Sequence, residues 1–105
     1  MKKYIVEVSE TANSDLENII SYIKYDLKEK NIADKYKLLF KQALKRLEDV
    51  AVSMPILSEE LTGHKNIRKI NVRKYILFYI VDDENNKVLV VRIGHALMDW
   101  GNLLN

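Results

Sequence analysis

Apolar residues change their spacing along the chain, and the change separates helices from strands. A short strand comes first, because apolar residues alternate with others over residues 4–9. Apolar residues then recur at every third or fourth position, which predicts an amphipathic helix from about Thr11 to Glu29 and a second from about Ile32 to Val50. Only a turn at residues 30–31 separates the two helices, so we expect an antiparallel helical hairpin.

Polar residues suggest where each helix begins. Asn31 has the side chain of an N-cap for the second helix. In the first helix, Ser14 and Glu17 have the spacing of a capping box, although they also fit an ordinary position in the first turn.

The second half of the chain has the pattern of a sheet. Residues 51–66 contain the single proline and predict a loop. Ile70 and Val72 then alternate with polar residues, whereas residues 75–81 and 88–91 are apolar on both faces and flank a polar turn. Short connections make these three strands antiparallel. The order predicts an α+β fold in one domain, residues 1–105: an N-terminal strand, a helical hairpin, three antiparallel strands in a small sheet and a short C-terminal segment.

A sheet with two apolar faces must be covered on both sides. The helical hairpin can cover one face. For the other face there are two candidates, which are the terminal segment "LMDWGNLL" folding back on the sheet and a second protein.

Composition favours a small globular protein of the cytoplasm. The chain has 105 residues, a net charge of +2 and no cysteine, which removes disulfides and thiolate metal sites and fits a reducing compartment. The N-terminus turns polar too early for a signal peptide, and no apolar run approaches the roughly 20 residues of a membrane helix. We therefore expect no membrane association.

Positive charge is concentrated in two segments. Residues 28–46 carry seven cationic and two acidic side chains, and residues 65–74 carry five cationic and no acidic ones. The first segment fits a solvated helix face. The second fits either a solvated strand or a positive patch that attracts phosphate or an acidic protein tail.

Catalytic motifs are scarce. There is no glycine-rich phosphate loop, no serine or cysteine nucleophile motif and no histidine or carboxylate spacing typical of a metal site, so we predict no metal and no cofactor. His95 follows the last strand and could act as a general acid or base, although a lone histidine is more often a structural hydrogen-bonding group. The acidic residues 82–84 fit a solvated turn.

One cationic set could act on RNA. Arg68, Arg73, Lys74, Arg92 and His95 could stabilise a phosphate transition state, with Tyr75 or Tyr79 stacking on a base. The alternative is that both tyrosines are core residues with polar tips.

The stretch "IRKINVRKYILFYIVDDENNKVLVVRIGHALMDW" resembles the RelE/ParE superfamily of bacterial toxins from type II toxin-antitoxin systems, and "ANSDLENIISYI" resembles the first helix of that family. The resemblance covers essentially the whole chain. It implies one of two activities, since RelE-like members cut messenger RNA on the ribosome, whereas ParE-like members poison DNA gyrase.

Several positions favour the ParE branch. RNA-cleaving members carry cations where this chain has Ile76 and Ala96, and "HALMDW" resembles the ParE tail pattern. The chain departs from that pattern at Ala96 and Leu97, which replace a small residue and an arginine. The resemblance therefore implies a gyrase inhibitor that acts by protein binding. Its expected target contacts are Arg73, Arg92, His95, Asp99 and Trp100.

Two other functions remain open. One is a ribosome-dependent mRNA endonuclease that uses His95, Arg68, Arg73 and Arg92, and the other is a degenerate homologue that only binds antitoxin. The resemblance also implies a cognate antitoxin in a heteromeric complex. We expect this antitoxin to contact Tyr22, Tyr36, Phe40, Lys69 and Lys74.

Overall fold

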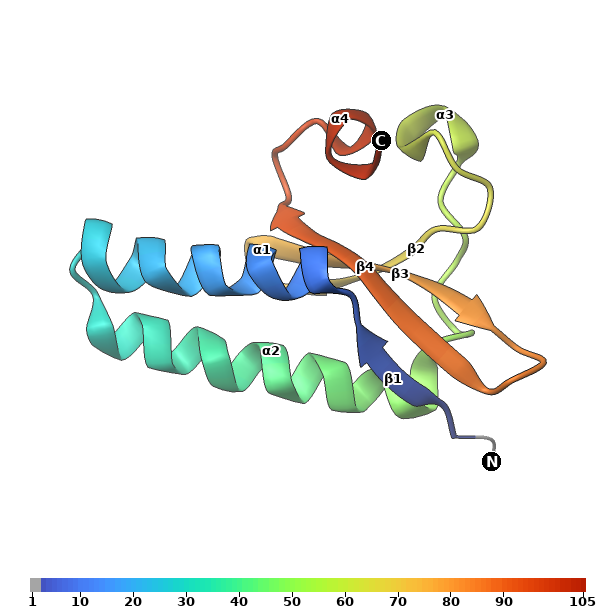
Figure 1. The fold of residues 1–105 in the computed structure, drawn as a ribbon, viewed down its shortest axis with the longest axis horizontal. Helices are drawn as coiled ribbons and strands as arrows, with labels where there is room; N and C mark the ends of the chain where they lie inside the picture. The colour runs from blue at the N-terminus through green and yellow to red at the C-terminus, as the bar shows by residue number, and fades with distance from the viewer. Residues whose placement is uncertain (1–2) are drawn as a thin grey trace.

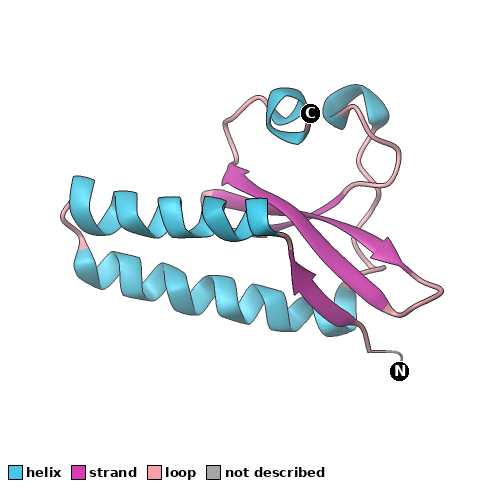
Figure 2. Cartoon of the chain, viewed as in Figure 1, coloured by secondary structure: helices cyan, strands magenta, loops and turns pink. Residues whose placement is uncertain are grey.

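A computed structural model describes residues 3–105, and its elements follow the predicted order (Figures 1 and 2). They are β1 (Ile5–Val8), α1 (Glu10–Ser21), a π-helical turn η1 (Tyr22–Asp26), α2 (Lys30–Val50), α3 (Glu59–Thr62), β2 (Arg68–Val72), β3 (Tyr75–Asp82), β4 (Lys87–His95) and α4 (Trp100–Leu104). The predicted α+β class, the helical hairpin and the three antiparallel strands are confirmed.

The sheet has four strands in the order β1-β4-β3-β2. Strand β1 lies at one edge and pairs in parallel with β4, so it joins the three strands predicted from the hairpin pattern. Strand β2 forms the other edge. The helical pair projects past the sheet at the α1–α2 turn, which accounts for the long axis of 43 Å (Figure 1).

The helix starts differ from the sequence prediction. Ser9 caps α1, since the backbone N–H of Ala12 donates to the Ser9 side chain at 3.0 Å. Ser14 lies inside the helix, so the capping-box interpretation is wrong. Glu29 occupies the N-cap of α2 without a side-chain hydrogen bond, and Asn31 lies in the first turn, so the predicted Asn31 cap is also wrong.

The first helix does not continue to Glu29 as an α-helix. After Ser21 it widens into η1, where the N–H of Leu27 donates to the carbonyl of Tyr22 at 3.0 Å. Lys28 then adopts a φ of 56°, which reverses the chain into α2.

Apolar side chains fill both sides of the sheet. One core lies between the sheet and the helical hairpin and includes Phe40, Leu47 and Tyr79. The other includes Phe78 and Leu103 and is covered by α4 and the loop before β2. Of the two candidates for the second face, the folded-back terminal segment is therefore correct, and Figure 1 shows it packed beside α3.

The two tyrosines of β3 have different environments. Tyr79 is 0% exposed, and its hydroxyl donates to the carbonyl of Ala51 at 2.7 Å. Burial raises the pKa of Tyr79 to about 12 although Arg68 acts in the opposite direction. The core interpretation is thus correct for Tyr79, which cannot stack on a base, whereas Tyr75 is only half-buried.

No helix within residues 3–105 has the length and apolar composition needed to cross a membrane.

Candidate functional site

A groove of about 350 Å³ lies where β4 leaves the sheet and gathers several of the predicted site residues. Strand pairing builds it, because Tyr75 is the register partner of His95 and the N–H of Ala96 donates to the carbonyl of Lys74 at 2.8 Å. The groove is lined by Asp15, Asn18, Ile19, Tyr22, Tyr75, Arg92, Ile93, Gly94, His95, Met98 and Leu103. We call this surface the His95 corner.

Aromatic rings form one wall of the His95 corner. The Tyr75 ring meets His95 edge-on at 5.5 Å and Tyr36 at 5.3 Å. The pKa of the Tyr75 hydroxyl is raised, first by burial and then by the neighbouring Tyr36 and Tyr22 hydroxyls. The Tyr75 side chain therefore keeps its hydroxyl proton at neutral pH. Because the residue is only half-buried, the ring and the hydroxyl can both contact a bound partner.

His95 braces the chain after β4. The backbone N–H of Leu97 donates to Nδ1 of His95 at 3.1 Å. This bond requires an unprotonated Nδ1, so the neutral imidazole carries its proton on Nε2. In that tautomer Nε2 is a donor, and the acceptor nitrogen of the ring is engaged by the N–H of Leu97.

Arg92 of β4 forms an ion pair with Asp15 of α1. Its Nε and NH2 donate to the two carboxylate oxygens of Asp15 at 2.8 and 3.0 Å, and its NH1 donates to the carbonyl of Leu103 at 2.8 Å. The Asp15 carboxylate also accepts from the N–H of Ile93 at 3.0 Å. The hydrogen bond to Asp15 raises the pKa of Arg92. These bonds join α1, β4 and α4, so Arg92 acts as a structural tie.

Arg68 lies at the other end of the sheet. Its register partner is Tyr79, whereas Tyr75 pairs with Val72, four residues further along β2 and about 13 Å away. The Arg68 guanidinium donates to the carbonyls of Val52 and Met54 and fastens the loop after α2. The structure therefore does not bring together the predicted phosphate-binding set of Arg68, Arg73, Arg92 and His95.

Arg73 and Lys74 form the exposed turn between β2 and β3, at the same end of the sheet as His95. Arg73 has a φ of 57°, which directs the two-residue turn. Of the expected phosphate-binding arginines, only Arg73 is both solvent-exposed and close in the strand register to His95.

Asp99 and Trp100 shape α4. The Asp99 side chain accepts from the N–H of Asn102 at 3.4 Å as the N-cap of that helix. The Trp100 indole donates to the carbonyl of Ala96 at 3.2 Å, and its ring packs edge-on against Phe78 at 5.4 Å. Both residues therefore have structural contacts that account for their side chains.

Two exposed apolar residues lie in the turn between His95 and Asp99. Leu97 is 90% exposed and Met98 is 48% exposed. The sequence analysis included both residues in the segment "LMDWGNLL" as a candidate cover for the sheet, and it treated Leu97 as a departure from the family pattern. It did not predict that the two side chains would be exposed. The sequence did contain a signal for this exposed apolar pair. Two large apolar residues stand next to each other in a segment that continues neither a strand nor a helix.

Comparison with known proteins identifies the family. The model for the ParE toxin of type II toxin-antitoxin systems, parDE, matches residues 6–100. The chain belongs to the ParE toxin family. No curated protein sequence matches it.

Two solved structures share the ParE-family fold. A chain of the chromosomal ParDE toxin-antitoxin system from P. aeruginosa is similar at 16% identity and a TM-score of 0.71, over 89% of this chain and 96% of that chain. A chain of the RelBE2 toxin-antitoxin complex from Mycobacterium tuberculosis is similar at 20% identity and a TM-score of 0.55, over 89% of this chain and 98% of that chain.

The antitoxin contacts expected for this ParE-family chain differ in exposure. Tyr22 is 50% exposed and Tyr36 is half-buried beside Tyr75, while Lys74 is exposed in its turn. Phe40 is 1% exposed and packs in the core between the helical hairpin and the sheet. It therefore offers no surface for the predicted antitoxin contact. Lys69 lies on β2 with its Nζ 5.7 Å from the centroid of the Trp100 ring.

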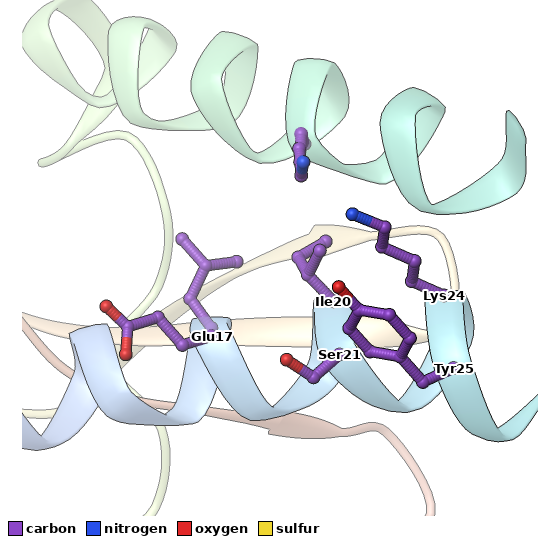
Figure 3. Close-up of a pocket in the computed structure, with 7 residues that line it drawn as sticks. Glu17, Ile20, Ser21, Lys24 and Tyr25 are labelled. Atoms are coloured by element: carbon purple, nitrogen blue, oxygen red, sulfur yellow. The ribbon is translucent and has the colours of Figure 1, made fainter. Parts of the chain in front are cut away.

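A second groove, of about 450 Å³, runs between α1, η1 and α2 (Figure 3). Figure 3 shows Ile20 and Lys24 directed toward α2, and Lys37 of α2 also lines the groove. Tyr25 at its end is 63% exposed. Glu17 also lines the groove, so its walls carry two lysines and one acidic residue beside the apolar side chains. Such a groove is suited to an amphipathic helix with acidic residues opposite the lysines.

Proposed function

We propose that this ParE-family protein inhibits DNA gyrase by direct protein binding through the His95 corner, and that a cognate antitoxin neutralises it. The observation that carries the proposal is the turn after His95, in which Leu97 is 90% exposed next to Met98 in the chain, while Met98 and the 50% exposed Tyr22 line the groove of the His95 corner. Large apolar side chains presented together at the rim of a groove are typical of a protein contact.

The charges at the His95 corner argue against RNA cleavage. Arg92 is paired with Asp15, Arg68 lies at the far end of β2, and Nδ1 of His95 accepts a backbone hydrogen bond. Each missing stabiliser of a phosphate transition state typically costs about a hundredfold in rate. The alternative function is a ribosome-dependent mRNA endonuclease. Of the predicted phosphate-binding set, it would have only Arg73 and His95 close together, so it has less support than gyrase binding.

Antitoxin binding fits the surface of the helical hairpin. The groove in Figure 3 combines the apolar Leu16 and Ile20 with two lysines, Lys24 and Lys37, and one acidic residue, Glu17. It therefore suits an amphipathic helix that places acidic residues opposite the lysines. The ParDE and RelBE2 relatives belong to toxin-antitoxin systems, which agrees with an antitoxin partner for this chain. The complex should weaken with added salt, because screening reduces attraction between exposed charges.

Gyrase poisoning can be measured directly. Purified protein is incubated with DNA gyrase and supercoiled plasmid and then treated with detergent and protease, and linear DNA is expected to accumulate. Leu97→Asp should reduce the linear product by at least about tenfold, since it places a charge in the buried centre of the contact. The control is Leu38→Asp, which places the same charge on a leucine of α2 that is 55% exposed and lies outside the turn after His95.

His95→Gln separates binding from catalysis. Glutamine removes the imidazole but keeps a polar side chain of similar length, so gyrase poisoning should fall by less than about tenfold. An endonuclease that used the imidazole would lose about a hundredfold or more. Absence of linear DNA with protein in excess over gyrase, together with mRNA cleavage in a translation reaction that His95→Gln abolishes, would establish the endonuclease instead.

A further inference from the structure

The two histidines of the chain use their rings in opposite ways. Nδ1 of His95 accepts the N–H of Leu97 at 3.1 Å, so this bond needs a ring nitrogen without a proton. Nε2 of His64 lies 2.9 Å from the carbonyl oxygen of Leu104, and toward a carbonyl the ring nitrogen is the donor. Because an imidazolium carries a proton on both nitrogens, protonation breaks the bond of His95 but keeps the bond of His64.

The bond that protonation breaks belongs to one residue of the turn after β4. The N–H of Ala96 donates to the carbonyl of Lys74 at 2.8 Å, and the N–H of Met98 donates to the carbonyl of His95 at 3.0 Å. These two bonds use backbone groups only, so a proton on the imidazole leaves them in place. Between them, a protonated Nδ1 would direct its N–H at the N–H of Leu97, and two donors repel each other. Acid therefore frees the backbone of Leu97 while its neighbours stay fixed.

Titratable and charged residues surround the His95 imidazole on every element packed near it. They are Asp15 of α1, Tyr22 of η1, Tyr36 of α2, Tyr75 of β3, Arg92 of β4, Arg73 and Lys74 of the β2–β3 turn, and Asp99 before α4. Asp15 and Arg92 are paired at 2.8 Å, so their charges oppose each other at the ring. Of these side-chain types, only an imidazole changes its charge between about pH 5 and 8 when unperturbed. His95 is therefore the group of this corner that responds to pH in that range.

The Leu97 bond has the strength to affect binding of a partner. One neutral hydrogen bond changes an equilibrium by roughly two- to tenfold. The Leu97 side chain is 90% exposed, so contacts of the side chain do little to fix its position. A residue whose backbone is ordered beforehand loses less conformational entropy when it enters an interface. The neutral imidazole therefore favours a contact through Leu97, and the imidazolium weakens it.

We propose that His95 is a pH-sensitive positioning residue, whose neutral imidazole fixes the Leu97 turn and whose protonation releases it. The turn is ordered at the alkaline end of the range from about pH 5 to 8 and is released as the pH falls. This inference deepens the proposed function, since its effect on gyrase rests on that function. The change in the turn is measured without gyrase, so the two can fail separately.

Nuclear magnetic resonance of the isotope-labelled full chain measures the bond directly. At about pH 8 we expect a scalar coupling between the Leu97 amide nitrogen and Nδ1 of His95, which should vanish at about pH 5. The Leu97 amide shift and the His95 ring should titrate with one midpoint. Protection of the Leu97 amide from exchange, corrected for the intrinsic effect of pH, should fall at least about twofold, while Ala96 and Met98 keep theirs.

Two variants assign the change to one histidine. His95→Gln should abolish the titration of the Leu97 amide, because it removes the ring that takes up the proton. His64→Gln is the matched control and should leave that titration unchanged, since His64 contacts Leu104 and not the turn. The coupling in the native chain keeps the test decisive if a variant does not fold.

The consequence for gyrase is measured as linear DNA at about pH 6 and at about pH 8. Dividing the product of the native chain by that of His95→Gln at the same pH removes the pH dependence of gyrase itself. The ratio should be about two- to tenfold at the higher pH and should approach one at the lower pH. An unchanged ratio beside a titrating turn would overturn the effect on target binding.

Two results would overturn the positioning role itself. They are absence of the scalar coupling at about pH 8 and a Leu97 amide that does not follow the titration of the His95 ring. If the native chain yields no linear DNA at either pH while the turn titrates, the proposed function fails and the pH-dependent turn remains.

Discussion

The ion pair between Asp15 and Arg92 is the contact whose loss should destabilise the protein most clearly. The Asp15 side chain is 15% exposed and the Arg92 side chain is 30% exposed, and the carboxylate accepts three hydrogen bonds. Asp15→Asn keeps the shape but removes the charge. Breaking a fully buried pair costs about 3–5 kcal/mol. Because Arg92 retains some solvent, we expect a loss of about 2 kcal/mol.

Urea unfolding followed by circular dichroism measures this loss. For a domain of this size, an m-value of about 1.3 kcal/mol/M converts a loss of about 2 kcal/mol into a midpoint about 1.5 M lower. The matched control is Asp34→Asn, since Asp34 pairs with Lys37 at 3.7 Å and both side chains are more than half exposed. Its free energy of unfolding should change by less than about 0.5 kcal/mol.

Equal midpoints for the Asp15 and Asp34 variants would refute the structural role of the Asp15–Arg92 pair. The result also bears on function. If the pair is structural, an Arg92 variant loses gyrase poisoning in proportion to its loss of folded protein. If Arg92 contacts the target, poisoning falls while the free energy of unfolding is unchanged.

Two further predictions concern single side chains. Unfolding free energy should fall between about pH 10 and about pH 12, because burial raises the pKa of Tyr79 from 10.0 to about 12 and the folded protein retains a proton that the unfolded chain releases. Tyr79→Phe should remove this part of the pH dependence and the exposed Tyr25→Phe should not, as measured by urea unfolding across that range. Ser9→Ala should cost about 1 kcal/mol in the same assay through loss of the cap on Ala12, whereas Ser14→Ala, inside the helix, should not destabilise the protein.

The sequence predicts those parts of the fold that depend on local periodicity. The strand pair around the polar turn at residues 83–86 and the two helices follow from apolar residues at intervals of two and of three to four. The folded-back C-terminal segment also follows, since two apolar sheet faces required a second cover. Each of these inferences uses residues within a few turns or strands of one another.

The spacing of apolar residues does not predict contacts between residues that are far apart in the chain. Asp15 and Arg92 are 77 positions apart, and nothing in the charge of either residue names the other as its partner. The parallel pairing of β1 with β4 likewise joins the two ends of the chain. The turn η1 has the same amphipathic spacing as the helix before it, so the pattern does not reveal its wider hydrogen bonding, in which the N–H of Leu27 donates to the carbonyl of Tyr22.

Site residues were predicted by chemical type, and packing decided their roles. Phe40 belongs to the amphipathic stripe of α2, and the stripe does not reveal which of its members reach the surface. Arg68 has the charge of a phosphate ligand, but two loop carbonyls satisfy it. Charge and aromaticity therefore pointed to the end of the sheet that carries Arg73, Tyr75 and His95, but they could not separate residues free to contact a partner from residues that hold the fold together.

In the segment "HALMDW", the residues on both sides of Leu97 are held by structural contacts, while the Leu97 side chain itself is exposed. A Cβ added to Gly94 would lie 2.6 Å from Cδ2 of Leu103, so α4 packs directly on the end of β4. Asp99 caps that helix, and His95 holds the turn through the N–H of Leu97. With both ends of the turn fixed, the side chain at position 97 can change without loss of the fold. Under the proposed function, target preference should therefore follow this residue, because its exposed leucine offers the target an apolar contact.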